Sequence, residues 1–286
     1  MKTLNYPDYP FTSRWISLPA GRMHYIDEGG GPTTIVFVHG TPTWSYEWRH
    51  LIRGLSSTSR IIAPDHLGFG LSDRPPGGDY SPEWHAKNFA DFMERLSPGP
   101  VVLVVHDYGG PIALGVAQQH PELVTGVVIV NSWMWSFELD KEMTSRGRIV
   151  GGSLGRFLYR WINFSLRVLM PSAYGNRAKL TPETHKVYLE RFKDRWSRGA
   201  VLWPLARALN GSSAFFRSLW EERARLSALP MLIVWGMKDS AFRPHQLARW
   251  IETYPHARVV RVEDAGHWPH EESPDRVAAA IESFLR

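Results

Sequence analysis

The 286-residue sequence predicts an α/β fold with a mostly parallel eight-stranded sheet, helices on both faces and an inserted helical cap. Short apolar runs alternate with amphipathic stretches along most of the chain, a pattern typical of parallel strands joined by helical crossovers. Residues 137–226 break this pattern, because they contain helical stretches rich in Arg and Trp and no strand-like run. We therefore expect a core made of residues 1–136 and 227–286, with residues 137–226 as the cap.

The first core part opens with two short strands, expected at residues 15–18 and 22–27, that pair as a hairpin at one edge of the sheet. Residues 34–38 are apolar after Thr34, as in a central strand buried on both faces. The later elements of this part are expected as a helix at 44–55, a strand at 61–63, a structural loop at 64–73 with Asp65 binding local amides, a helix at 82–96 capped by Ser81, a strand at 100–105, a helix at 111–120 and a strand at 126–131. The second core part is expected to add strands at 231–235 and 258–262 and helices at 245–254 and 275–285.

Composition excludes several classes of protein. The chain has no cysteine, which rules out disulfides, a thiol nucleophile and thiolate metal sites. Residues 1–14 contain no apolar stretch of signal-peptide or membrane-spanning length. We expect a cytoplasmic protein without a membrane partner.

The net charge of +5 is unevenly distributed along the chain. Residues 141–225 hold 17 Lys and Arg against 6 Asp and Glu, while the remainder holds 16 against 22. No nucleic-acid-binding module accompanies the basic segment, so we interpret it as solvated helix faces and predict no nucleic-acid partner. A positive field near the active-site mouth would favour anionic substrates or products.

A strand, a sharp turn and a helix at residues 100–120 have the layout of a nucleophile elbow, with Asp107 at the exposed position of His106-Asp107-Tyr108-Gly109-Gly110. Most such turns carry serine. A carboxylate is ionised at pH 7 and can displace a leaving group at a saturated carbon, forming an alkyl ester on the enzyme. The alternative, an aspartate that only caps the following helix, is disfavoured by the apolar strand before it and the glycines after it.

Hydrolysis of that ester requires a general base with a pKa near neutrality. His267 directly follows the last predicted strand, where a loop at the carboxyl end of the sheet can bring it to the elbow. Asp239, after the strand at 231–235, is the expected acid partner that orients the ring. Asp264 is the alternative acid, whereas Asn131 is uncharged and cannot serve. The order Asp107, Asp239, His267 matches the nucleophile, acid, histidine order of α/β-hydrolases.

An oxyanion hole completes the predicted site. The backbone N–H groups of Thr41 and Tyr108 are expected to form it, since Thr41 follows the third strand and Tyr108 follows the nucleophile.

A second motif resembles a serine elbow. Residues 151–155 match G-x-S-x-G, but no parallel strand precedes them. We interpret that match as a loop in which Ser153 caps a helix at 156–164 rather than as a serine-hydrolase elbow.

With these residues in place, the chain resembles the haloalkane dehalogenases, which are kin to the epoxide hydrolases. The shared motifs are residues 39–46, residues 104–110, and Ala265-Gly266-His267 followed by residues 271–274. The resemblance implies an α/β-hydrolase fold with a mobile helical cap, a small apolar or halogenated substrate, release of a halide ion, and neither a metal nor an organic cofactor.

The chain departs from that family at two positions. Family members usually have Trp after the nucleophile and often Asn after His-Gly, and both hold the departing halide; this chain has Tyr108 and Thr41. Each can donate one hydrogen bond, and the cap tryptophans Trp161, Trp196 and Trp203 are candidates for another.

Three other functions stay open at this point. An epoxide hydrolase would use the same triad but would need two cap tyrosines, for which Tyr159, Tyr174 and Tyr188 are available. Attack on a strained ring such as a β-lactone, which relatives of this family carry out, is a further alternative. A binding protein that has lost turnover is disfavoured by the complete set Asp107, Asp239 and His267.

Overall fold

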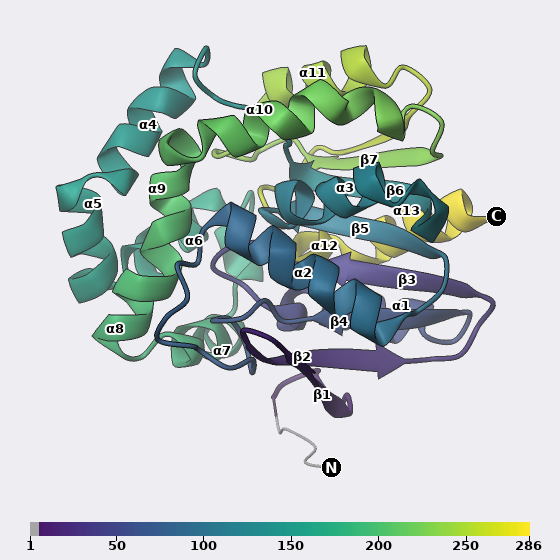
Figure 1. Ribbon diagram of the computed structural model, residues 1–286, viewed down its shortest axis with the longest axis horizontal. Helices are drawn as coiled ribbons and strands as arrows, with labels where there is room; N and C mark the ends of the chain where they lie inside the picture. The colour runs from purple at the N-terminus through teal and green to yellow at the C-terminus, as the bar shows by residue number, and fades with distance from the viewer. Residues whose placement is uncertain (1–5) are drawn as a thin grey trace.

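A computed structural model of the protein describes residues 6–286. Residues 1–5, part of the N-terminal segment 1–14 considered above, lie outside the described residues. Across residues 6–286 the strands form one eight-stranded sheet in the order β1-β2-β4-β3-β5-β6-β7-β8 (Figure 1). β1 pairs with β2 and β2 with β4 in antiparallel fashion, and every other neighbouring pair is parallel. The predicted fold class and the hairpin edge are thereby confirmed.

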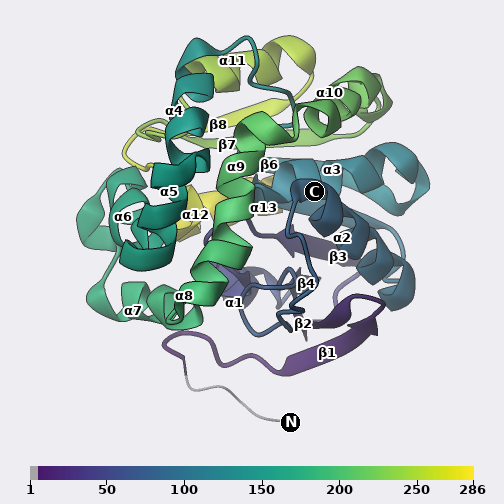
Figure 2. The same cartoon turned by 60° about the vertical axis from the view of Figure 1, so that its left-hand side comes forward.

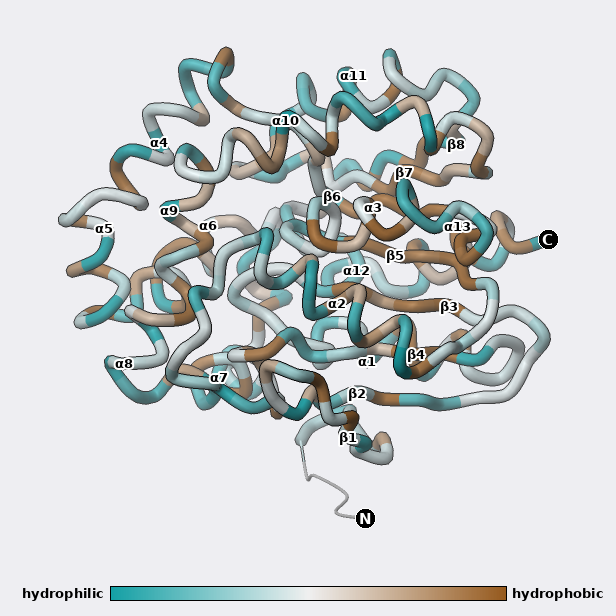
Figure 3. Tube along the Cα trace, in the orientation of Figure 1, coloured by the Kyte–Doolittle hydropathy of each residue, from teal (hydrophilic) through white to brown (hydrophobic). Residues whose placement is uncertain are grey.

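The strands agree with the predicted ones to within a few residues. Those of the first core part are β1 Ser13–Leu18, β2 Gly21–Glu28, β3 Thr33–Val38, β4 Ser59–Pro64, β5 Val101–Asp107 and β6 Val124–Ser132. Those of the second part are β7 Met231–Gly236 and β8 Arg258–Val262. β5 and β7 are buried at every position, as expected for central parallel strands covered on both faces, and the hydropathy colouring shows β3 and β5 as apolar runs through the centre (Figure 3).

Helices cover both faces of the sheet. In Figure 1, α2 and α3 lie in front of it and α12 and α13 behind it, and α13 also contacts α1. The helices of the two core parts are α1 Arg49–Leu55, α2 Pro82–Leu96, α3 Gly109–Gln119, α11 Pro244–Thr253, α12 Pro269–Glu272 and α13 Pro274–Leu285. Ser81 caps α2 by accepting a hydrogen bond from the Trp84 amide, as predicted. The predicted helix at 44–55 is divided into a 3-10 turn, Ser45–Trp48, and α1.

Between β6 and β7 the described chain contains helices and loops but no strand. Its α-helices are α4 Lys141–Gly151, α5 Ser153–Phe157, α6 Met170–Ala173, α7 Pro182–Arg191, α8 Arg195–Ser197, α9 Trp203–Gly211 and α10 Ser213–Glu221. Single π-helical turns lie at Leu158–Ile162, Ser165–Leu169 and Arg198–Leu202. α4 to α9 form a layer beside the sheet, visible from two directions (Figures 1 and 2).

The structure corrects the predicted role of Ser153. Ser153 does not cap a helix: it is the first residue of α5, Gly152 occupies the cap position, and no side chain caps the helix. Only Gly152 separates α4 from α5, and its carbonyl accepts the first helical hydrogen bond of α5, from Arg156 N–H, so the glycine takes the cap position and Ser153 lies inside the helix. Separately, none of the described helices combines the length and apolar character needed to cross a bilayer.

Candidate active site

Four of the predicted site residues, Thr41, Asp107, Tyr108 and His267, line a pocket of about 440 Å³ between the core and the helical segment. The core contributes residues from the carboxyl ends of the strands, and the helical segment contributes mainly apolar side chains. The polar and aromatic side chains in this lining include Thr41, Asp107, Tyr108, Trp133, Tyr159, His267 and Trp268. Such a pocket, apolar with a few convergent polar groups, suits a small apolar ligand.

Asp107 occupies a sharp turn between β5 and α3 that places it at the floor of the pocket. Its φ is 49°, in the left-handed region that residues other than glycine rarely adopt. Neighbouring glycines allow this geometry: a Cβ on Gly40 would lie 2.4 Å from the Asp107 carboxylate, and one on Gly109 would lie 2.2 Å from the Val38 carbonyl oxygen. The strand, strained turn and helix predicted from the sequence are therefore present.

The two carboxylate oxygens of Asp107 have different neighbours. Oδ1 accepts a hydrogen bond of 2.8 Å from the backbone N–H of Thr41. Oδ2 lies 3.5 Å from Nε2 of His267. The hydrogen bonds of residues 6–286 include none from the Tyr108 amide to this carboxylate, so only one of the two predicted oxyanion donors bonds Asp107 here.

His267 is brought to the elbow by the loop after β8, and its Nδ1 lies 2.8 Å from Oδ2 of Asp239. Asp239 is itself fixed, because Oδ2 accepts from the Asn131 amide at 2.8 Å and Oδ1 from the Ala241 backbone at 2.6 Å. Asp264, the alternative acid, is exposed. The structure thus joins Asp107, His267 and Asp239, and Asn131 orients the acid rather than replacing it.

Two carboxylates control the charge of His267. Burial favours the neutral ring, but the negative charges of Asp239 and Asp107 outweigh it and raise the pKa of His267 to about 10. At neutral pH the ring is therefore an imidazolium between two carboxylates. Removing either negative charge must lower the pKa of the ring.

The hydroxyl group of Tyr108 does not point to a free halide position. It donates a 2.6 Å hydrogen bond to the backbone carbonyl of Leu205 in α9. Burial, with a smaller contribution from the charge of Asp107, raises the pKa of this hydroxyl well above its usual value, so the proton stays on the phenol. The Tyr108 side chain thereby ties the elbow to the helical segment.

The three cap tryptophans named as candidate donors are not among the pocket-lining residues. Trp161 and Trp196 are 47% and 44% exposed, and the Trp203 ring contacts the guanidinium groups of Arg156 and Arg207, at 5.3 and 5.5 Å from the ring centroid. None of the three therefore has the expected place in this pocket. The rings of Trp161 and Trp196 are turned to solvent, whereas Trp203 packs against the core with its indole N–H buried outside the pocket lining.

Two other tryptophans, which the sequence did not single out, do line the pocket. Trp133 follows β6 and Trp268 follows His267, and neither indole N–H has a hydrogen-bond partner among the described residues. The ring centroids of Trp133 and Tyr108 are 4.7 Å apart, and those of Trp268 and His267 are 4.6 Å apart. Their positions directly after a parallel strand and after the histidine were the available signal, because both places face the carboxyl edge of the sheet.

The three candidate tyrosines are separated by the fold. Tyr174 and Tyr188 both donate to the carboxylate of Glu271, which is also paired with Arg49 at 2.8 Å. Tyr159 alone of the three lines the pocket. A pair of ring-protonating cap tyrosines is therefore not assembled from these residues.

Two other groups bear on the site. Ser153 of the G-x-S-x-G match is exposed and follows helix α4, not a strand. Glu47, His106 and His270 are buried, and one carboxylate oxygen and one nitrogen of each imidazole lie within 4.8 Å of one another. Among the described residues, these three could together hold a metal ion.

Comparison with known proteins agrees with this geometry. The family model described as alpha/beta hydrolase fold matches residues 33–274. Haloalkane dehalogenase 2 of Mycobacterium tuberculosis is 36% identical over 274 residues, covering 96% of this chain and 94% of the relative. A cis-3-alkyl-4-alkyloxetan-2-one decarboxylase of Xanthomonas campestris is 33% identical, covering 99% and 98%. The chain belongs to the α/β-hydrolase fold family and, within it, to the hydrolase group that includes the haloalkane dehalogenases, as the sequence motifs predicted.

Solved structures show the same fold at lower identity. The haloalkane dehalogenase DbeA from Bradyrhizobium elkani superposes with a TM-score of 0.83 at 22% identity, covering 96% of this chain and 99% of that one. DatA from Agrobacterium tumefaciens superposes with a TM-score of 0.81 at 24% identity, covering 96% of each chain. At these identities the likeness establishes the fold alone.

The charge arrangement yields a prediction that needs no substrate. Asp107→Asn removes one of the two charges next to His267 and should lower the pKa of the ring from about 10 toward its ordinary value of 6.5. Because the wild-type pKa is raised on folding, the ion pairs stabilise the fold fully below about pH 6.5, and this contribution is lost as pH rises through about 10. NMR titration of the His267 ring measures the change. An unaltered pKa in the Asn variant would show that Asp107 does not control the ring.

Proposed function

We propose that the protein hydrolyses alkyl halides through an alkyl ester on Asp107, and that Asp107, His267 and Asp239 are its catalytic residues. The observation that carries the proposal is a carboxylate at the elbow, where a serine would imply acyl chemistry, in contact with a histidine that a second carboxylate orients. A carboxylate nucleophile suits attack on a saturated carbon. The relatives named haloalkane dehalogenase support this substrate class.

In the first step, Asp107 displaces the halide. Oδ1 is engaged by the Thr41 amide, which leaves Oδ2 to attack the carbon that carries the halogen. The new C–O bond forms as the carbon–halogen bond breaks, and the halide leaves with the electron pair. The mainly apolar lining lowers the local polarity, which strengthens the attraction between a developing halide ion and a nearby N–H.

In the second step, water attacks Cγ of the ester. Alkylation cancels the negative charge of Asp107, so His267 keeps only Asp239 as a counter-charge and releases its proton more readily. The neutral ring then accepts a proton from water as the hydroxide adds to Cγ. Negative charge develops on the carbonyl oxygen Oδ1, which the Thr41 amide holds. The bond between Cγ and Oδ2 then breaks, the departing oxygen takes the proton from the His267 imidazolium to give the alcohol, and the proton of the new carboxyl group returns to His267, which restores the Asp107 carboxylate. The balance is alkyl halide and water to alcohol, halide and a proton.

We further propose that Trp133 and Trp268 supply the halide donors. The Tyr108 hydroxyl is engaged by Leu205, whereas both indole N–H groups are buried and without a partner in the described residues. Both rings line the pocket that Asp107 enters. An unpaired buried N–H is costly, and a halide ion that accepts it would remove this cost.

The second candidate function is opening of a strained lactone ring. The relatives named oxetan-2-one decarboxylases match nearly the whole chain, and the family positions for halide donors are occupied by Thr41 and Tyr108. Ring opening needs no halide donor, because the leaving carboxylate stays attached to the substrate. The epoxide reading has less support, since Tyr174 and Tyr188 are bonded to Glu271.

The remaining proposals concern context. We propose that residues 137–226 act as a cap whose position governs access to the pocket, which both segments line. Halide ion is proposed as a product and a small apolar or halogenated molecule as the substrate. A cytoplasmic location stays a prediction of the sequence.

The covalent step is tested by two variants. Asp107→Ala should abolish turnover, because no nucleophile remains. His267→Phe should still be alkylated but should accumulate the ester, which intact-mass spectrometry and peptide mapping would place on Asp107. Ser153→Ala is the control and should retain full activity. Retained turnover in Asp107→Ala, or its loss in Ser153→Ala, would contradict the assignment.

The halide donors are tested with 1,2-dibromoethane. Trp133→Phe and Trp268→Phe should each reduce the rate of alkylation about ten- to a hundredfold, because a hydrogen bond to a charged group contributes about 1.5–3 kcal/mol. Trp161→Phe, on the exposed face, is the matched control and should react at the wild-type rate. If the control and both pocket variants react alike, other groups hold the halide.

Product analysis separates the two candidate functions. Wild-type protein should release bromide and 2-bromoethanol from 1,2-dibromoethane and should leave a cis-3,4-dialkyl oxetan-2-one unchanged over the same period. Conversion of the lactone with no bromide release would favour the second candidate. Styrene oxide serves as the probe for epoxide opening and should stay intact.

A further inference from the structure

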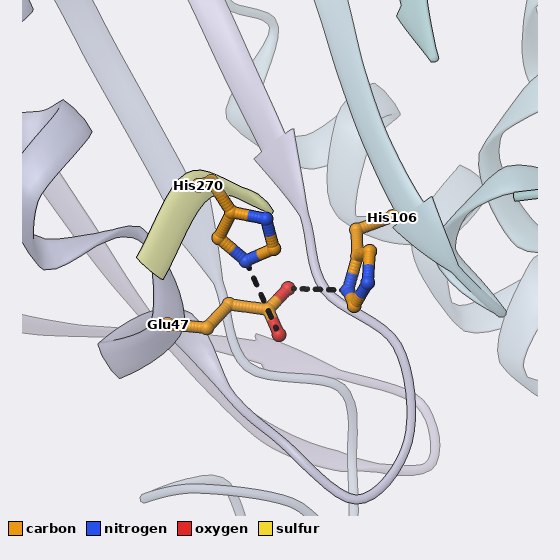
Figure 4. A group of neighbouring side chains, drawn as sticks. All are labelled: Glu47, His106 and His270. Carbon is orange, nitrogen blue, oxygen red and sulfur yellow. Dashed lines mark hydrogen bonds and ion pairs between the residues drawn. The ribbon is translucent and has the colours of Figure 1, made fainter. Parts of the chain in front are cut away.

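A fully buried cluster lies directly behind the catalytic residues proposed above. It consists of Glu47 from the 3-10 turn Ser45–Trp48, His106 from the end of β5, and His270 from α12 (Figure 4). Oε1 of Glu47 lies 3.3 Å from Nδ1 of His106, and Oε2 lies 3.9 Å from Nε2 of His270. Glu47 thus has a histidine on either side, and the proposed mechanism uses none of the three.

The hydrogen bonds of His106 determine where its protons lie. Nε2 is 2.8 Å from the backbone carbonyl oxygen of His267, and a carbonyl oxygen only accepts, so Nε2 carries a proton. Nδ1 faces the Glu47 carboxylate, which also accepts when it is ionised. Two facing lone pairs would repel, so an ionised Glu47 requires a second proton on Nδ1 and therefore an imidazolium.

The surroundings favour this charge distribution. Although burial alone would raise it, the pKa of Glu47 is held well below its usual range by His106 and His270. Burial lowers the pKa of His270 to about 4, so this ring is neutral at neutral pH. Of the two histidines, His106 has the nitrogen closer to the Glu47 carboxylate, at 3.3 Å against 3.9 Å for His270.

His106 contacts the site on two sides. It precedes Asp107 in the chain, and its Nε2–H bonds the backbone of His267. The centroids of the His106 and His267 rings are 4.7 Å apart. A charge on His106 therefore acts directly on the proposed base.

We propose that Glu47 is a positioning residue: it keeps His106 doubly protonated, so that His106 holds the backbone of the His267 loop and presents a positive charge behind the His267 ring. The inference rests on the proposed function in one respect, the role of His267 as the base that activates water. The protonation of His106 and its effect on His267 can be tested without any substrate.

The sign of the effect follows from the order of the charges. Glu47 contacts Nδ1 of His106, whereas the opposite ring nitrogen, Nε2, bonds the His267 backbone. A positive charge on the His106 ring, 4.7 Å from the His267 ring, disfavours the imidazolium form of His267. It opposes the raising effect of Asp239 and Asp107 and thereby helps the ring to release its proton after alkylation. The titratable or charged groups that face the two histidines are Asp107, Asp239, Glu47, His270, His39 and the Arg49–Glu271 pair.

A metal ion is the alternative occupant of this donor set. It would take Nδ1 of His106 and Nε2 of His270 as lone-pair ligands, with Nε2–H of His106 bonded to a carbonyl as metal-bound histidines often are. The cluster offers three side chains, and His270 Nδ1, His270 Nε2 and Glu47 Oε2 lack partners among the described residues. Three side chains are one fewer than the four of a structural zinc site, so a zinc ion here would need a water molecule as its fourth ligand.

The central test is Glu47→Gln, which keeps the shape of the side chain and removes its charge. Nitrogen-15 NMR of the substrate-free protein should show two protonated ring nitrogens on His106 in the wild type at pH 7 and one in the variant. The pKa of His267 should rise in the variant. With 1,2-dibromoethane, alkylation should stay within about twofold of wild type, while ester hydrolysis at pH 7 should slow about three- to tenfold and recover at higher pH.

Three controls keep the outcome decisive. His106→Gln retains an N–H for the His267 carbonyl without the charge, and should reproduce the rise in the His267 pKa even if Glu47→Gln fails to fold. His24→Gln breaks another buried histidine–carboxylate pair, His24 with Asp65 at 2.8 Å, and should leave the His267 titration unchanged. Glu47→Asp restores the charge and should return the pKa of His267 toward the wild-type value.

Several results would overturn the proposal. A singly protonated His106 in the wild type, or a His267 pKa that does not change in Glu47→Gln, removes the positioning role while leaving Asp107 alkylation intact. One equivalent of zinc in the purified wild type, lost together with stability on chelation, would assign the cluster to a metal. Absence of any alkylation in the wild type would instead count against the proposed function and not against the NMR result.

Discussion

The close approach of the loop after β3 to the turn at Asp107 is the constraint on which the site depends. A side chain at Gly40 would overlap the carboxylate, and one at Gly109 would overlap the backbone of β3. With both residues reduced to backbone, the Thr41 amide reaches Oδ1 while Oδ2 faces His267. Asp107 keeps a left-handed backbone, with φ at 49°, between strand β5 and helix α3, which is the kind of local strain that folds retain at functional sites.

Charge balance is the second feature that links the parts of the site. An imidazolium at His267 lies between two carboxylates, and the buried Glu47–His106 pair lies behind it. Buried charges are stable only when they are paired. Each charge in this row therefore depends on its neighbours, and a reaction that neutralises Asp107 alters the proton affinity of the ring beside it.

The helical segment is tied to the same loop that carries His267. The His267 amide donates to the Ala173 carbonyl, and Glu272 accepts hydrogen bonds from Gly266 on one side and from Gly175 and Asn176 on the other. The Tyr108 hydroxyl makes a further connection to α9. The helical segment is thus attached to the elbow and to the loop that carries His267. A displacement of this segment would therefore shift residues of both proposed half-reactions.

The sequence alone determined the order of strands and helices, the fold class and the family, because local hydrophobic periodicity and short glycine-containing motifs carry that information. It also indicated Asp107, His267 and Asp239, since parallel strands bring their carboxyl ends to one edge of the sheet. Only the tertiary structure decided which aromatic side chains reach the pocket. Trp161, Trp196 and Trp203 carry the same donor as Trp133 and Trp268, but only the latter two follow core segments that end at the pocket. The same holds for the Tyr108 hydroxyl and for the Glu47–His106–His270 cluster, whose members are far apart in the chain and meet only when three elements pack together.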